Sequence, residues 1–268
     1  MASTTKAFDG LAANYESFRP NYPVALLDQL KVNATPIPHG YIVDVGTGTG
    51  ILLDQLHSTF GQNFQYVGVE PNHDMIVRAR KTIHIGTTIL VEASAESMPL
   101  PDASAAVITA AQCLHWLDRK KFLAEAARLL AKGGTLAVLY NERDSSNSFM
   151  SGYEHFVAEF NAYNDSATGT ERAGLGIALL RDGTFRRELA ETPRVDGLKE
   201  FRHAWRRDMR PDEFVGMCLS TVQMQNVIRS LGEREALGRL RSLIERSCTG
   251  GDTFSVPYVT TLLAARMR

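Results

Sequence analysis

The chain has 268 residues, of which 44% are hydrophobic and 22% are charged. These fractions argue against a disordered or fibrous protein, and the length suits one large α/β domain with a smaller elaboration. The formal net charge of -1 removes the main argument from composition for binding nucleic acid or an anionic membrane surface.

Targeting and cysteine signals are sparse. No apolar stretch approaches the roughly 20 residues of a spanning helix, and the start of the chain lacks the apolar segment of a signal peptide. We therefore expect a cytoplasmic protein with no membrane segment. Cys113, Cys218 and Cys248 lie too far apart for a metal-ligand pair or a disulfide framework, so we expect reduced core thiols and no metal site.

Short β-branched runs alternate with helical patterns from Tyr41 onward. The runs that predict strands are 41–45, 65–70, 87–93, 105–111 and 135–140. Such alternation predicts a parallel sheet covered by helices. The clearest helix is 118–132, which Gly133 and Gly134 are expected to end before the strand at 135–140.

The pattern changes after Tyr140. A helix over 149–163 is followed by a Gly/Thr/Asp-rich stretch near 165–176, typical of an insertion or lid. A strand is predicted within 201–209, helices over 211–225 and 232–246, and a last strand over 253–267.

The strongest functional signal lies between Val43 and Gly50, which read VDVGTGTG before an apolar helix over 51–60. Glycines permit a tight turn and a close approach of the backbone to a ligand. The next strand ends in Glu70, about twenty residues on, where a carboxylate can accept hydrogen bonds from both ribose hydroxyls. The pattern predicts a nucleotide cofactor.

A nicotinamide dinucleotide fits this turn poorly. Its fingerprint requires a small residue at the third glycine position, where close helix packing is needed. Ile51 occupies that position, and the additional glycine falls at Gly50 instead. The absence of a convincing Tyr-x-x-x-Lys pair further disfavours a nicotinamide-dependent oxidoreductase.

The turn and Glu70 together resemble motif I and the acidic residue of class I S-adenosylmethionine-dependent methyltransferases. The segment 93–104, ASAESMPLPDAS, resembles the stretch that lines the adenine in that family. The resemblance implies that Glu70 holds the ribose and that Met75 packs against the adenine. The other residues it assigns to the cofactor in this part of the chain are Asp44, Gly46, Thr47, Gly48, Gly50, Ser94, Ala95 and Glu96.

Two further motifs resemble a small-molecule subset that includes trans-aconitate methyltransferase. They are Gln112-Cys113-Leu114-His115-Trp116 and the Y-x-x-x-R-P-x-Y-P pattern that starts at Tyr15. The resemblance adds Gln112, Tyr15 and Arg19 to the cofactor site, the last two as partners of the methionine carboxylate. It covers 8–140 well and the remainder weakly.

The family resemblance implies a doubly wound, mostly parallel, Rossmann-like seven-stranded sheet with an antiparallel C-terminal strand and a small helical cap. We divide the chain into a segment that folds over the cofactor (1–40), an S-adenosylmethionine-binding core (41–140), a cap that forms the acceptor pocket (141–215) and the C-terminal part of the core (216–268).

His115, at the carboxyl end of a strand, is the first candidate for a general base. The residues expected to contact the acceptor are Trp116, Tyr153, His203 and Arg206. The basic alternating run 202–207 could direct His203 or Arg206 to an anionic substrate, although a solvated face explains the same run.

The expected function is transfer of a methyl group from S-adenosyl-L-methionine to a small organic molecule by a monomer or homodimer. Methylation of a small carboxylic acid such as trans-aconitate is an alternative. A protein that binds the cofactor without transferring methyl, including a pericyclase-like one, has the same sequence signals. Nucleic acid and protein substrates rank lower, since no base-flipping signature is present.

Overall fold

The computed structural model describes residues 8–34, 37, 40–83, 86, 88–161, 175–247 and 252–268. The chain divides into two compact units. Unit 1 comprises Met1–Pro20, Glu142–Gly174 and Ala204–Val259, and unit 2 comprises Asn21–Asn141, Leu175–His203 and Thr260–Arg268. Cys248 and most of the predicted 165–176 insertion lie outside the described residues.

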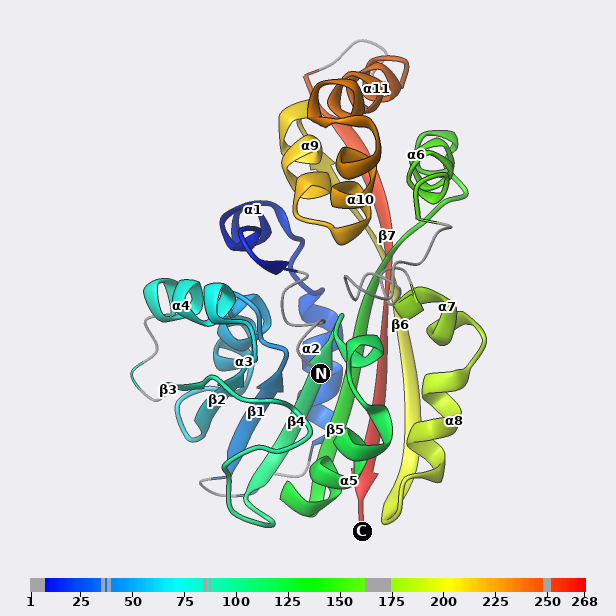
Figure 1. The fold of residues 1–268 in the computed structure, drawn as a ribbon. Coiled ribbons are helices and arrows are strands. Elements are labelled where there is room, and N and C mark those ends of the chain that lie inside the picture. The colour runs from blue at the N-terminus through cyan, green and yellow to red at the C-terminus, as the bar shows by residue number, and fades with distance from the viewer. Residues whose placement is uncertain are drawn as a thin grey trace. The chain divides into compact units, whose positions relative to one another are not determined.

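Seven strands form one mixed sheet in the order β3-β2-β1-β4-β5-β7-β6 (Figure 1). Most of them are parallel, and the C-terminal strand β7 runs antiparallel, which confirms the predicted fold class. The strands are β1 (Tyr41–Val45), β2 (Gln65–Val69), β3 (Thr88–Val91), β4 (Ala105–Ala111), β5 (Leu130–Arg143), β6 (Val195–Met209) and β7 (Phe254–Met267).

Unit 2 buries both faces of the parallel strands. Alternate residues of β1 point to opposite faces, so Ile42 joins a core with α2 (Val24–Asn33) and α3 (Ile51–Phe60). Val43 joins a second core with α5 (Arg119–Leu129) and α8 (Thr184–Glu191). Both residues are fully buried, and each such side chain stabilises the fold by about 1.5–3 kcal/mol. The remaining helices of unit 2 are α4 (His73–Thr82), the short 3-10 helix η2 (Leu114–Trp116) and α7 (Leu175–Arg181).

The predicted end of the 118–132 helix is wrong. The helix ends at Leu129, and Leu130 is already extended and paired with Ala105 of β4. Gly133 and Gly134 lie inside β5, where the register with β4 shifts. A Cβ at Gly134 would lie 2.9 Å from the carbonyl oxygen of Ala131, so this glycine serves an irregularity of the strand.

Unit 1 contains α1 (Ala12–Phe18), α6 (Ser148–Ala158), α9 (Pro211–Leu219), α10 (Val222–Leu231) and α11 (Glu233–Glu245). Phe214 is central to its core, with ring centroids 5.1 Å from Phe149 and 5.4 Å from Tyr153. The single helix predicted over 211–225 is two helices, because the side chain of Thr221 accepts a hydrogen bond from the Met224 N–H and starts α10. The predicted last strand is confirmed as β7.

Among the described residues, none of the helices combines the length and the apolar character that a membrane-spanning segment requires.

Candidate functional site

Three predicted site residues follow neighbouring strands of unit 2 at the same edge of the sheet. Val45 of β1 pairs with Val69 of β2 and with Ala110 of β4. Gly46, Glu70 and Gln112 are the first residues after β1, β2 and β4, so they gather at the carboxyl ends of these strands. The strand order reverses between β1 and β4, and ligands of open α/β sheets bind at such a point.

The glycine-rich turn joins β1 to α3 through backbone conformations that side chains disfavour. Gly46, Gly48 and Gly50 have φ values of 61°, 58° and 90°. A Cβ at Gly46 would lie 2.8 Å from the Cβ of Cys113, and one at Gly50 would lie 2.2 Å from Cδ1 of Ile83. Packing against the protein thus demands glycine at position 46, where the neighbour is a Cβ, whereas at position 50 the end of the Ile83 side chain can shift and the φ of 90° is what favours glycine.

Glu70 links the turn to the end of β2. One carboxylate oxygen accepts the Gly48 N–H at 2.9 Å, and the other accepts the Asn72 N–H at 2.9 Å. Burial raises the pKa of Glu70 to about 7, although both hydrogen bonds act to lower it. An ionised carboxylate offers about four acceptor positions, so this carboxylate has positions left for the two hydroxyls of a ribose.

Asp44 lies near the end of β1, and Thr47 lies within the turn. Asp44 accepts a hydrogen bond from the Thr109 hydroxyl of β4 at 2.7 Å, and burial raises its pKa to about 6. Thr47 is buried, and its backbone N–H donates to the Val69 carbonyl at 3.1 Å. These contacts tie β1, β2 and β4 together below the predicted cofactor position.

Met75 lies in the first turn of α4, five residues after Glu70 in the chain. The side chain of Asn72 caps this helix by accepting the Met75 N–H at 3.0 Å. Met75 is buried. Sequence reasoning did not select Asn72, although an Asn just before a helix is a recognisable capping signal.

The predicted adenine segment is fixed by a network that the sequence analysis missed. Ala95 is buried, and Glu96 accepts hydrogen bonds from the Ser94 hydroxyl and from the Asp118 N–H. Farther along, Arg128 of α5 donates to the carbonyls of Met98 at 3.1 Å and Leu100 at 3.0 Å. The partners that hold Arg128 in place are Glu125 and Asp102.

Gln112 has a φ of 57°, which is uncommon for a residue with a side chain. Its side-chain amide donates to the Asn141 carbonyl at 2.8 Å, and its backbone N–H donates to the Leu139 carbonyl at 2.9 Å. Backbone strain of this kind concentrates at functional sites, where the surrounding structure maintains it.

His115 is buried and contacts Tyr140 of β5. Its Nδ1 lies 2.9 Å from the Tyr140 hydroxyl oxygen, which also accepts the His115 backbone N–H at 3.4 Å. Because that oxygen already accepts a hydrogen bond, we infer that its own proton is donated to Nδ1, which leaves the ring proton on Nε2. Trp116 lies against the imidazole with ring centroids 5.0 Å apart, and Gly176 of α7 packs over it.

The candidates for the methionine carboxylate lie in unit 1. The Arg19 guanidinium is 4.7 Å from the centre of the Tyr15 ring. Its Nε donates to the Ser220 hydroxyl at 3.0 Å, and Nη2 donates to the Ser220 carbonyl at 3.2 Å. The two residues are brought together, as their spacing of one helical turn predicts.

The predicted acceptor residues belong to different environments. Tyr153 is fully buried, with the Arg143 guanidinium 4.7 Å from the centre of its ring. His203, in unit 2, is half-buried, whereas Arg206, in unit 1, is exposed on the opposite face of β6. Arg207, which the sequence analysis did not select, is half-buried on the same face as His203.

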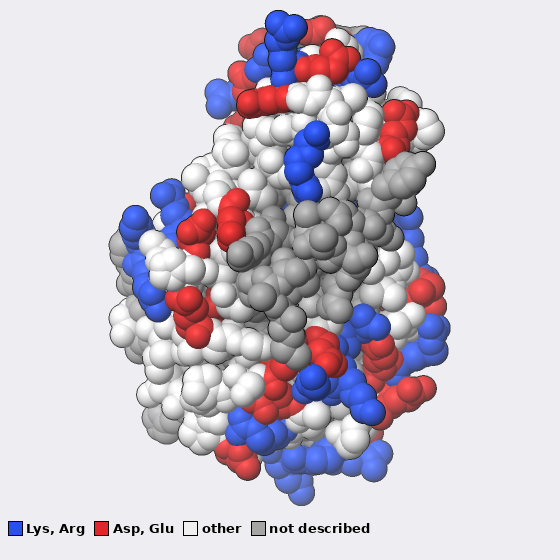
Figure 2. Space-filling model, in the orientation of Figure 1, with Lys and Arg blue, Asp and Glu red and all other residues white. Residues whose placement is uncertain are grey.

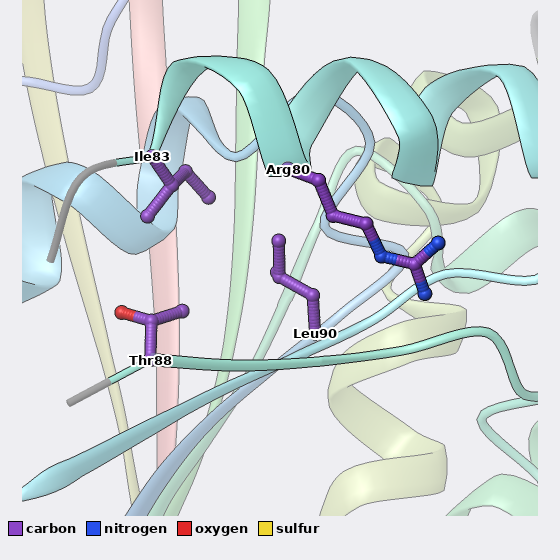
Figure 3. Close-up of a pocket in the computed structure, with 4 residues that line it drawn as sticks. All are labelled: Arg80, Ile83, Thr88 and Leu90. Atoms are coloured by element: carbon purple, nitrogen blue, oxygen red, sulfur yellow. The ribbon is translucent and has the colours of Figure 1, made fainter. Parts of the chain in front are cut away.

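A pocket of about 270 Å3 lies at the first residues of β3 (Figure 3). Arg80 and Ile83, at the end of α4, line it together with Thr88 and Leu90 of β3. None of these four residues belongs to the predicted site.

Residues 43–138 match the model of a family described as "Methyltransferase domain". An uncharacterized methyltransferase of Mycobacterium tuberculosis is 32% identical over 138 residues, which are 52% of this chain and 53% of the relative. An uncharacterized methyltransferase-like protein of Schizosaccharomyces pombe is 28% identical over 141 residues, 53% of this chain and 54% of the relative. The chain thus spans about half the length of the curated relatives it matches.

Solved structures share the fold over most of the chain. A protein of Anaeromyxobacter dehalogenans, provisionally described as a type II methyltransferase, superposes with a TM-score of 0.69 at 22% identity, covering 93% of this chain and 98% of its own. Phosphoethanolamine N-methyltransferase 2 of Haemonchus contortus, solved with S-adenosylhomocysteine, gives a TM-score of 0.53 at 15% identity, covering 97% and 57%. The fold is therefore one found in methyltransferases.

Proposed function

We propose that the chain is an S-adenosylmethionine-dependent methyltransferase that acts on a small organic molecule. The observation that carries the proposal is the buried carboxylate of Glu70, joined to the glycine turn at the carboxyl ends of β1 and β2. The match of residues 43–138 to a methyltransferase domain supports it, since those residues include both features.

The residues present fit this cofactor. Glycine at 46, 48 and 50 leaves three of the five positions of the turn without a side chain, and Glu70 offers acceptors to a ribose. Met75 and Ala95, both buried, are the apolar residues that we propose lie nearest the adenine ring. Arg19 and Tyr15 remain our candidates for the methionine carboxylate, because a guanidinium forms strong charge-assisted bonds with it. The other proposed contacts are Asp44, Thr47, Ser94, Glu96 and Gln112.

When bound, S-adenosylmethionine supplies an activated methyl group. The chain's own residues then have to orient the acceptor and exclude water, which can provide much of the catalysis. His115 can take a proton at Nε2 only after its own ring proton moves to Nδ1, which requires the Tyr140 hydroxyl to turn away.

A small acceptor agrees with the distribution of charge. Figure 2 shows Lys and Arg intermixed with Asp and Glu over the face it draws, and the net charge is -1. A continuous basic surface favours the binding of a polyanion such as nucleic acid, and the mixed charges on this face do not form one. Membership in the subset that includes trans-aconitate methyltransferase, the cytoplasmic location and the monomeric or homodimeric state stay predictions.

Calorimetric titration with S-adenosylmethionine tests the cofactor. We expect micromolar binding that Glu70→Ala weakens about ten- to a hundredfold, roughly 1.4 to 2.7 kcal/mol. Asp54→Ala is the matched control, because Asp54 is an exposed carboxylate on α3. A folded wild-type chain that binds a nicotinamide dinucleotide, and no S-adenosylmethionine, would overturn the proposal.

Turnover is tested separately by following S-adenosylhomocysteine formation with panels of small organic acceptors. Product that forms only with an acceptor indicates methyl transfer. Tight cofactor binding without product for any acceptor favours the alternative of a binding or pericyclase-like protein.

A further inference from the structure

Two residues of unit 1, Arg143 and Tyr258, face each other across neighbouring strands. The backbone N–H of Asp144 donates to the Pro257 carbonyl at 2.9 Å. Because β5 and β7 are antiparallel neighbours, the adjoining residues Arg143 and Tyr258 lie opposite one another with their side chains on the same face.

The third strand, β6, adds Trp205 and Arg207 to this face. Trp205 stacks on Tyr258 with ring centroids 4.7 Å apart and an interplanar angle of 17°. Side chains two residues apart in a strand point the same way, so Arg207 follows Trp205 onto this face. The burial of successive side chains along β6 alternates accordingly, since Trp205 and Arg207 are half-buried and Arg206 is exposed.

The electrostatic surroundings of Tyr258 include the two arginines of this face. Burial raises the pKa of Tyr258, and the positive charges of Arg143, Arg207 and Arg19 all act to lower it. The Tyr258 hydroxyl itself donates to the sulfur of Met217 in α9 at 3.1 Å. Three guanidinium groups thus lie close enough to one tyrosine to affect its ionisation.

Of these three guanidinium groups, Arg143 alone forms an ion pair with a carboxylate among the described residues. Arg207 Nη1 donates to the Phe18 carbonyl at 2.7 Å, and Arg19 donates to Ser220, so both bind uncharged oxygens. Neither makes an ion pair with a carboxylate among the described residues. Arg143 pairs with Glu154 at 3.0 Å. Partly buried charge without a counter-ion is costly, and an anionic ligand removes that cost.

We propose that the acceptor of the methyl group carries a carboxylate or phosphate group, which Arg207 and Arg143 bind. Half-buried Trp205, two residues before Arg207 on β6 and stacked on the buried ring of Tyr258, offers apolar surface to the adjoining part of the acceptor. A guanidinium suits this task because its fork of N–H groups matches two oxygens of one anion. The assignment of the anion to the methyl acceptor rests on the proposed function. The anion site itself is inferred from residues of unit 1 alone.

Malonate and inorganic phosphate serve as probes, titrated calorimetrically into the full chain with and without saturating S-adenosylhomocysteine. We expect binding to the wild type that Arg207→Gln weakens at least tenfold, which is about 1.4 kcal/mol. Arg206→Gln is the matched control, since it removes the same charge from the next residue on the other face. No binding of either probe by the wild type, or an equal loss in both variants, overturns the proposal.

The anion that these arginines bind could also be the methionine carboxylate of the cofactor. A second comparison distinguishes the carboxylate of the cofactor from an anionic group of the acceptor. S-adenosylhomocysteine contains this carboxylate, and 5′-methylthioadenosine lacks it. We expect Arg207→Gln to leave the affinity for both compounds within a factor of three. A loss confined to S-adenosylhomocysteine would assign Arg207 to the cofactor and overturn the acceptor site. Failure of the wild type to bind any of these adenosine compounds would reject the proposed function, while probe binding reports on the anion site by itself.

Discussion

The carboxylate of Glu70 accepts the backbone N–H of Gly48 at 2.9 Å, across a separation of 22 residues. The hydrogen bond joins the residue proposed to hold the ribose to the turn proposed to approach the methionine part. Both partners are buried, so the strength of this contact depends on whether the carboxylate is ionised.

Cofactor affinity should therefore depend on pH. Burial raises the pKa of Glu70 to about 7, and protonation below that value replaces an acceptor by a donor. We expect the Kd for S-adenosylhomocysteine to rise, approaching about tenfold per unit as the pH falls from 7 to 6. Calorimetry across this range measures it, with Glu70→Gln as the variant whose curve should be flatter. If the Kd of the wild type and that of Glu70→Gln depended equally on pH, protonation of Glu70 would not be the cause of the pH dependence.

Stability should change with pH in the opposite direction. The folded-state pKa values of Glu70 and Asp44, about 7 and about 6, lie above their ordinary values of 4.5 and 3.8. Between these limits the folded state binds more protons than the unfolded state, so these two groups make the free energy of unfolding rise as the pH falls from about 7 to about 4.5. Urea unfolding at pH 5 and pH 7.5 tests this, and Glu70→Gln should reduce the difference.

Gly46→Ala should destabilise the chain by two separable effects. A φ of 61° costs an ordinary residue about 1–2 kcal/mol. The new Cβ would also lie 2.8 Å from the Cβ of Cys113, and overpacking of this kind costs about 1–3 kcal/mol more. Gly197→Ala is the control, because Gly197 has a φ of 67° and nothing within 4 Å. Equal unfolding free energies for the two variants would show that the turn accommodates the new Cβ without an overpacking penalty.

Arg128→Met should loosen the 93–104 segment. It removes the donors to the Met98 and Leu100 carbonyls, which we expect to reduce the free energy of unfolding by about 1–3 kcal/mol and to weaken cofactor binding. The control is Arg239→Met on the exposed surface of α11, whose pair with Glu235 is worth at most about 1 kcal/mol. Unchanged protease sensitivity around Met98 would contradict the role given to Arg128.

The tautomer of His115 can be measured directly. We expect 15N chemical shifts typical of an unprotonated Nδ1 and a protonated Nε2, because the Tyr140 hydroxyl lies 2.9 Å from Nδ1. Tyr140→Phe should allow exchange between the two tautomers while the imidazole still packs against Trp116. A protonated Nδ1 in the wild type would instead make Nε2 available as a base.

Much of the fold could be predicted because its signals are local or follow from parallel strands. The strand, turn and helix around Gly46 are set by neighbouring residues, and Glu70 lies beside that turn because the carboxyl ends of parallel strands meet. The end of α5 was misplaced because Leu130 pairs with Ala105, and that contact is not visible in a helical pattern that continues to Lys132.

The alternation of strands and helices, the turn from Gly46 to Gly50 and the position of Glu70 follow from patterns of neighbouring residues. Which arginine of the basic run faces inward follows from the fold, since the phase of β6 depends on the stacking of Trp205 on Tyr258. The fold also placed Arg143 opposite Tyr258 and a hydroxyl against His115. Strand register and side-chain hydrogen bonds join residues that are distant in the chain, and no local pattern specifies such pairs.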